Sequence, residues 1–121
     1  YGRSLGTGLA AAWAARHQPD LTILVSPYAS MRQLAALHYP WVPSAVVRYP
    51  LRSDEAVAQL HRPLLLVHGD RDALIPLAHS QQLAGAAEQA RLVVIEGAAH
   101  ADVHRFEAYQ AALSRALEAL H

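Results

Sequence analysis

The sequence has 121 residues, which is enough for one domain at most. Ten arginines balance ten acidic residues, so there is no surplus of positive charge to neutralise phosphates, and we expect no nucleic-acid partner. The sequence contains no cysteine, which excludes disulfides, thiolate metal sites and a cysteine nucleophile.

The first eight residues contain the pattern G-x-S-x-G around Ser4. This pattern is typical of a sharp strand-to-helix turn that exposes a serine hydroxyl above the end of a sheet. Gly2 and Gly6 let the backbone close such a turn without steric collision. The turn would place Ser4 at a helix N-terminus, where the N–H of Leu5 faces a developing oxyanion.

Strands and helices alternate along the rest of the chain. Three short apolar runs without alternation predict strands buried on both faces, as in a parallel sheet covered by helices: Leu21–Val25, Leu64–Val67 and Leu92–Ile95. Composition and helical spacing predict helices at Leu9–His17, Ala78–Glu88 and Val103–Leu120. This order predicts an α/β fold with right-handed crossovers.

The segment 27–62 interrupts the alternation. It holds four of the seven prolines, three of the five tyrosines and Trp41. Such an insertion between two core strands predicts a small cap over a pocket, and its apolar side chains favour a substrate with an apolar acyl chain. A pair of packing helices without a ligand role is the alternative.

Polar clusters follow the second and third predicted strands. They are His68–Pro76 and Glu96–His100. Open α/β sheets place their active sites at these strand ends. A serine needs a histidine to take its proton, and the histidine needs a carboxylate to fix its tautomer and stabilise its charged form. The chain order Ser4, Asp72, His100 matches the order on α/β-hydrolase scaffolds.

Taken together, these motifs resemble the C-terminal half of an α/β-hydrolase, in the branch of serine-aminopeptidase-like hydrolases, lysophospholipases and depalmitoylating thioesterases. The resemblance rests on Gly-Arg-Ser-Leu-Gly at residues 2–6, Ser-Pro-Tyr at 26–28, His-Tyr-Pro-Trp at 38–41, the cluster at 68–76 and Gly-Ala-Ala-His at 97–100. It implies that Ser4 is the nucleophile, Asp72 the triad acid, His100 the base and the Leu5 N–H one oxyanion donor.

The resemblance implies hydrolysis of a small-molecule ester, thioester or amide through an acyl-serine intermediate, with no metal or organic cofactor. Residues 1–121 would form a partial α/β-hydrolase domain with three parallel strands and the cap-like insertion at 27–62. No strand is expected ahead of Ser4, and the second oxyanion donor would come from an earlier strand that this sequence lacks. The alternative is therefore a non-catalytic fragment or pseudoenzyme, and we expect little activity from the chain alone.

Three further patterns compete with this interpretation. Asp70 is a rival to Asp72 for the triad acid, although the carboxylate three residues before Ile75 is the catalytic one in the resembling pattern. His100 and His104 have the spacing of zinc ligands on a helix, but the glutamate of H-E-x-x-H is missing.

The third pattern is G-x-G-x-x-A at residues 6–11, which fits a dinucleotide fingerprint. That reading needs an acidic residue at the end of the next predicted strand to hold a ribose, and Ser26 stands there instead.

The source and compartment are only weakly indicated. No apolar run reaches the length of a membrane-spanning helix, so membrane association is not visible in this sequence. The ten Lys and Arg positions are all arginine, and alanine is abundant. This composition indicates a GC-rich, bacterial genome. The compartment stays open, with the cytoplasm weakly favoured.

Overall fold

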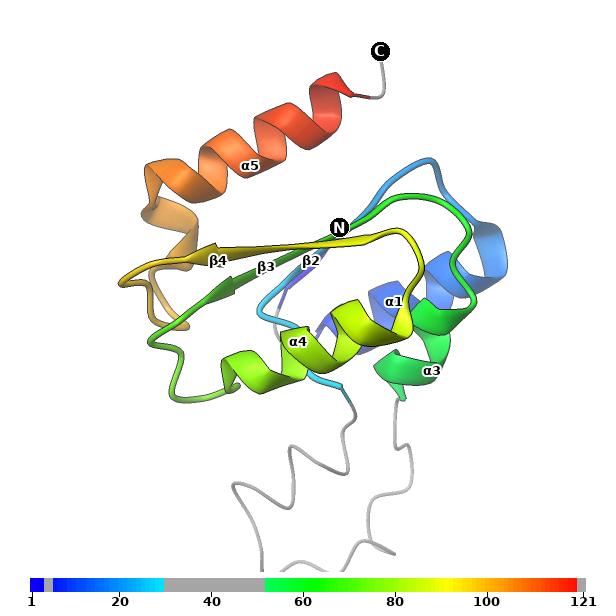
Figure 1. Cartoon of the computed structure of the whole chain (residues 1–121), viewed down its shortest axis with the longest axis horizontal. Coiled ribbons are helices and arrows are strands. Elements are labelled where there is room, and N and C mark those ends of the chain that lie inside the picture. Colours follow the sequence, from blue (N-terminus) through cyan, green and yellow to red (C-terminus); the bar gives the residue numbers. More distant parts are fainter. Residues whose placement is uncertain (4–5, 30–51, 120–121) are drawn as a thin grey trace, which may run out of the picture.

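The computed structural model describes residues 1–3, 6–29 and 52–119, which form a parallel sheet with helices on both faces (Figure 1). Within these residues the strands lie in the order β1-β2-β3-β4, and each neighbouring pair is parallel. The strands are β1 (Gly2–Arg3), β2 (Thr22–Val25), β3 (Leu64–Gly69) and β4 (Ala90–Ile95). The structure thus confirms the α/β architecture and the three predicted strands.

Helices cover the two faces unequally. On one face lie α1 (Gly6–His17), α3 (Ser53–Ala58) and α4 (Leu77–Ala86). On the other lies α5 (Glu107–Glu118), preceded by the short 3-10 helix η2 (Val103–Arg105). In Figure 1, α1, α3 and α4 lie below the sheet and α5 lies above it.

The apolar strand runs serve both layers because successive side chains of a strand point to opposite faces. Leu24, Leu64 and Leu66 pack with α1, α3 and α4 in one buried cluster. Their sequence neighbours Val25 and Leu65 pack in a second cluster with residues of η2 and α5. A buried central strand therefore needs apolar residues at every position, as the sequence indicated.

Two strand expectations are wrong. A strand does precede Ser4: β1 is only two residues long and pairs with β2, with Arg3 opposite Val25. A two-residue strand has no apolar run by which a sequence could reveal it. The other error concerns β4, whose Val94 is 43% exposed. In the described part of the sheet β4 pairs only with β3, and an edge strand is covered less completely than a central one.

The predicted helix Val103–Leu120 is interrupted. Phe106 has extended backbone angles (φ −80°, ψ 140°), which separate η2 from α5. The amide of Phe106 still bonds the carbonyl of Val103, and its own carbonyl accepts from Tyr109 and Gln110. Apolar spacing continues across this break, so periodicity alone could not reveal it.

Most of the predicted cap-like insertion, residues 30–51, lies outside the described residues, so the cap stays a prediction. The later part of the insertion forms α3, which packs against α1 and α4. Its Val57 is fully buried in the cluster beneath the sheet.

The loop after β4 approaches the end of β3 closely at Gly69. A Cβ atom at Gly69 would overlap the carbonyl oxygen of Ala98 and lie 2.8 Å from its carbonyl carbon. Both are backbone atoms, so they cannot move aside as a flexible side chain can. The loop after β4 therefore sits directly against the end of β3.

We predict that Gly69→Ala destabilises the fold by about 1–3 kcal/mol, the usual cost of overpacking. Gly85→Ala is the matched control, because a Cβ there meets no atom within 4 Å and Gly85 lies in helix α4. That change should stabilise the protein by about 0.5–1 kcal/mol. Denaturant unfolding of both variants measures the difference, and equal effects would contradict the close approach at Gly69.

Candidate active site

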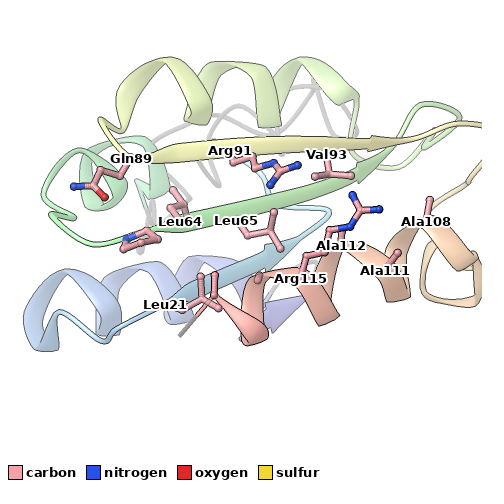
Figure 2. Close-up of a pocket in the computed structure, with 13 residues that line it drawn as sticks. Leu21, Leu64, Leu65, Gln89, Arg91, Val93, Ala108, Ala111, Ala112 and Arg115 are labelled. Atoms are coloured by element: carbon pink, nitrogen blue, oxygen red, sulfur yellow. The ribbon is translucent and has the colours of Figure 1, made fainter. Parts of the chain in front are cut away.

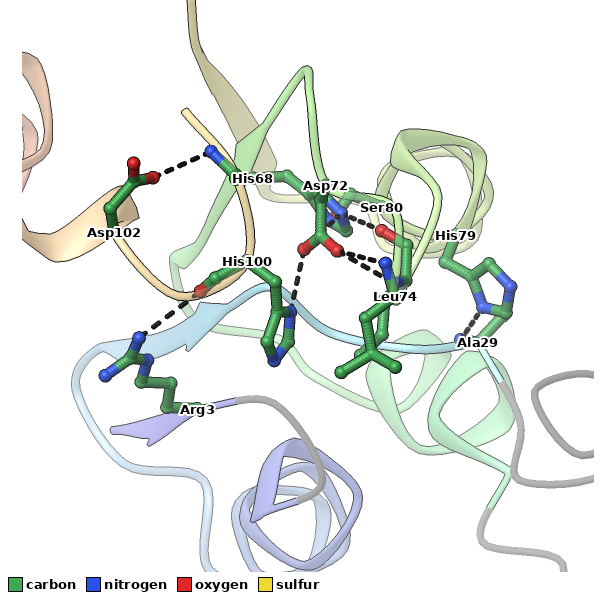
Figure 3. Close-up of polar contacts among 11 residues, drawn as sticks. Arg3, Ala29, His68, Asp72, Leu74, His79, Ser80, His100 and Asp102 are labelled. Carbon is green, nitrogen blue, oxygen red and sulfur yellow. Dashed lines mark hydrogen bonds and ion pairs between the residues drawn. The ribbon is translucent and has the colours of Figure 1, made fainter. Parts of the chain in front are cut away.

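Asp72 and His100 meet at the C-terminal edge of the sheet (Figure 3). Strands β3 and β4 are paired in register to their ends, with Gly69 opposite Ile95, so the loops that follow emerge side by side. The Oδ2 atom of Asp72 accepts a hydrogen bond from Nδ1 of His100 at 2.9 Å. The Asp72 side chain is fully buried and that of His100 is 20% exposed.

This bond fixes the protonation pattern of the His100 ring. A carboxylate can only accept, so Nδ1 carries the proton, and in the neutral ring Nε2 then has the lone pair of a base. A buried carboxylate also stabilises the charged ring that forms when the base takes up a proton. The pair thus has the geometry of the acid and base of a catalytic triad.

The backbone that follows Asp72 holds its carboxylate in place. Oδ1 accepts the N–H of Leu74 at 3.0 Å and that of Ile75 at 2.8 Å. Ile75 is fully buried, and Pro76 directly precedes α4. One oxygen of Asp72 therefore bonds the backbone of its own turn, and the other bonds His100. The three-residue spacing between Asp72 and Ile75 allows the first of these contacts.

Asp70 has a different partner. Its Oδ1 accepts the N–H of Gly97 at 2.8 Å, and the neighbouring amide of Arg71 bonds the carbonyl of Ala98 at 2.9 Å. These bonds join the loop after β3 to the loop after β4. Asp70 thus holds together the two segments that carry Asp72 and His100.

Ser4 and Leu5 lie outside the described residues, and the structure describes the chain on either side of them. Strand β1 ends at Arg3 and helix α1 begins at Gly6, so two residues connect strand to helix. A Cβ at Gly2 would lie 2.6 Å from the Cβ of Ala10, so β1 and α1 are tightly apposed. The described flanks therefore have the arrangement that a nucleophile turn requires.

Arg3, the last residue of β1, contacts the loop that carries His100. Its Nη2 donates a hydrogen bond to the carbonyl oxygen of His100 at 3.3 Å (Figure 3). The residue directly before Ser4 is thus attached to the backbone of His100.

His68 and Ser80 lie beside the candidate site, and no sequence pattern indicated this. His68, at the start of the polar cluster 68–76, belongs to strand β3, and Ser80 belongs to α4. In the structure both are fully buried, and His68 lies behind Asp72 (Figure 3). Burial lowers the pKa of His68, and this outweighs the raising effects of its hydrogen bond to Ile75 and of the Asp72 charge.

The segment after β2 is also part of this edge. Ser26 has φ +52°, a left-handed conformation that is strained for a residue other than glycine. Its hydroxyl is buried and has no hydrogen-bond partner among the described residues. Tyr28 is fully buried, and burial raises the pKa of its hydroxyl while a hydrogen bond with the backbone of Gly8 lowers it.

The zinc alternative finds no support in the described part of the chain. His100 and His104 do not share a helix, because the intervening residues form turns and the start of η2. No group of three or more histidine, aspartate or glutamate side chains in residues 1–3, 6–29 and 52–119 is placed to hold a metal ion.

An apolar hollow of about 370 Å³ lies between α5 and the sheet (Figure 2). Leu21, Leu64 and Gln89 line it, and they stand at or just before the N-terminal ends of β2, β3 and β4. Asp72 and His100 stand beyond the opposite ends of the strands. This hollow is therefore separate from the candidate active site.

Among the described helices, none combines the length and apolarity needed to cross a membrane.

Comparison with known proteins places the chain among α/β-hydrolases. A family model described as TAP-like protein matches residues 26–119. An uncharacterised protein of Mycobacterium tuberculosis strain H37Rv is 38% identical over 106 residues, which are 84% of this chain and 37% of that protein. The human α/β hydrolase domain-containing protein 17B is 27% identical over 110 residues, 90% of this chain and 37% of that protein.

The fold is shared with solved structures as well. The esterase domain of a Rhodothermus marinus protein has a TM-score of 0.71 and 19% identity, over 94% of this chain and 57% of that one. Identity at this level shows a common fold. The chain spans 37% of the length of both curated relatives.

We predict that Asp72→Asn lowers turnover and that Asp70→Asn affects mainly the stability of the fold. Asparagine at position 72 can still accept the turn amides, but its NH₂ group facing His100 favours the wrong tautomer, so turnover should fall by about 10⁴ while the fold persists. Asparagine at position 70 keeps an acceptor for Gly97 and should cost at most about 1 kcal/mol of stability. Steady-state kinetics and thermal unfolding measure both variants, and a larger rate loss at position 70 would refute the assignment.

Proposed function

The chain belongs to the α/β-hydrolase family, in its TAP-like group, and we propose that it carries the Ser4–Asp72–His100 triad of a serine hydrolase. The observation that carries this proposal is the 2.9 Å hydrogen bond between Asp72 and His100 at the ends of adjacent parallel strands. The tight apposition of β1 and α1 on either side of Ser4, and the bond from Arg3 to the His100 backbone, support it.

The proposed reaction begins when Nε2 of His100 removes the proton of the Ser4 hydroxyl as its oxygen attacks the substrate carbonyl. The negative charge that develops on the carbonyl oxygen is stabilised by the N–H of Leu5 and by a second donor from elsewhere in the protein. The charged His100 ring, stabilised by Asp72, returns the proton to the leaving group, and an acyl-serine remains. Water then releases the acid by the same steps, with His100 again as base.

The proposed substrate is a small-molecule ester, thioester or amide with an apolar acyl chain. Leu74 stands two residues after Asp72 and is 47% exposed, so this edge of the sheet offers an apolar side chain near the base. The aromatic residues of the insertion are the second reason, as a cap would place them over the same edge. The chemistry proposed here needs no metal or organic cofactor, since the triad itself supplies nucleophile, base and acid.

The proposal predicts that a fluorophosphonate probe labels Ser4, because the activated serine oxygen displaces fluoride from phosphorus. Ser4→Ala should abolish labelling and lower kcat by on the order of 10⁶. Ser114→Ala, at an exposed position of α5, is the matched control and should leave both unchanged. Peptide mass spectrometry locates the adduct. A folded protein that takes up no label would instead indicate a pseudoenzyme.

A further inference from the structure

Two fully buried polar residues, His68 of β3 and Ser80 of α4, form a connection behind the Asp72 turn (Figure 3). Nδ1 of His68 lies 2.7 Å from the hydroxyl oxygen of Ser80. Nε2 lies 2.6 Å from the carbonyl oxygen of Ile75. Both ring nitrogens are therefore engaged, and the ring joins helix α4 to the turn that begins at Asp72.

The partners determine which nitrogen of His68 carries the proton. The Ile75 carbonyl can only accept, so Nε2 must donate to it. Burial lowers the pKa of His68, which keeps the ring neutral near pH 7. In the neutral ring Nδ1 then has the lone pair and accepts from the Ser80 hydroxyl. The acceptor-only Ile75 carbonyl thus selects the tautomer, and the Ser80 hydroxyl, which can donate or accept, adjusts to it and holds the other side of the ring.

The Ile75 peptide is held from both sides. Its carbonyl accepts from His68 at 2.6 Å, and its N–H donates to Oδ1 of Asp72 at 2.8 Å. The other oxygen of Asp72 accepts from His100 at 2.9 Å. A continuous series of buried hydrogen bonds thus runs from α4 through His68 and the turn to the candidate base.

The opposite tautomer would act against this arrangement. With the proton on Nδ1, the lone pair of Nε2 would face the Ile75 carbonyl oxygen, and the Oδ2 atom of Asp72 lies only 3.5 Å away. Three acceptors would then converge without a hydrogen between them, and a buried acceptor without a donor is unfavourable. The tautomer of His68 therefore decides whether the turn is held or pushed apart.

We propose that His68, whose Nε2–H donates to the Ile75 carbonyl and whose ring is anchored to α4 by Ser80, is a positioning residue that holds the Asp72 carboxylate against His100 through the Ile75 peptide. The inference rests on the proposed role of Asp72 as triad acid. It assigns His68 no contact with substrate. Its effect is to limit the directions in which the carboxylate can turn while the His100 ring gains and loses its proton.

The test compares His68→Met, which removes the donor at similar volume, with His68→Gln, whose side-chain N–H can again reach the Ile75 carbonyl. Leu83→Ala is the control, because it opens a cavity in helix α4, three residues after Ser80, within the apolar cluster of Leu24, Leu64 and Leu66 and without removing a polar group. The readout is the ¹⁵N spectrum of the His100 ring, which distinguishes the Nδ1–H tautomer from the Nε2–H tautomer.

We expect one tautomer, Nδ1–H, in the wild type, in Leu83→Ala and in His68→Gln, and a mixture of both in His68→Met. If His68→Met does not fold, Ser80→Ala provides the test: the His68 ring loses one of its two hydrogen bonds and is held less firmly, so the His100 ring should become partly mixed. An unmixed His100 spectrum in a folded His68→Met protein or, where that variant does not fold, in Ser80→Ala would overturn the proposal. Mixing in Leu83→Ala would do so too, because it would show a general effect of lost stability.

Kinetics provide a second readout. His68→Met should lower kcat by about 10–100-fold with little change in KM, by analogy with the loss of a supporting hydrogen bond behind a metal ligand. The NMR readout needs no turnover, so it separates the two ideas. Mixed tautomers without any hydrolysis would reject the proposed function alone, whereas normal hydrolysis with unmixed tautomers would reject the role of His68 alone.

Discussion

The hydrogen bond between Asp72 and His100 is the interaction on which the account of this protein depends. It joins two loops that are far apart in the chain and meet only because β3 and β4 are paired in register up to Gly69 and Ile95. The absence of a side chain at Gly69 lets the loop after β4 lie against the end of β3. Asp70 then fastens the loops by accepting the amide of Gly97. Asp72 and His100 are thus positioned mainly by contacts of the backbone around them, which leaves few ways for the pair to separate.

The sheet provides the rigid base for this edge. Alternate residues of β2 and β3 enter two different apolar clusters, so these strands are anchored from both faces. The polar groups concentrate where the strands end, and there each buried group has a named partner: Asp72 its turn amides, His68 the Ile75 carbonyl and Ser80. The exceptions among the described residues are the hydroxyl of the strained Ser26, which stands at the same edge, the hydroxyl of Ser53 in α3 and Nδ1 of His104 in η2.

The sequence could predict what depends on local pattern, and two-sided apolar runs indicated β2 and β3. The choice of Asp72 over Asp70 came from the resemblance to α/β-hydrolases and stays a prediction, which the contact between Asp72 and His100 supports. What it could not predict depends on long-range pairing. β1 exists only because Gly2 and Arg3 pair with β2, and Val94 is exposed because β4 has one neighbour within the described sheet. Ser80 carries no motif at all, since its importance arises from a histidine twelve residues earlier that folds back onto it.

The measurement that tests the central claim most directly is the additivity of Ser4→Ala and His100→Ala in turnover by the protein. Residues that act as one unit are strongly non-additive, because removing either already disables the shared proton transfer. If Ser4 and His100 act as one unit, the double variant will be no slower than the slower single variant, within about threefold, a margin far smaller than the loss of about 10⁶ in either single variant. Losses that multiply in the double variant would show that Ser4 and His100 act independently, and would contradict a triad built on the Asp72–His100 pair.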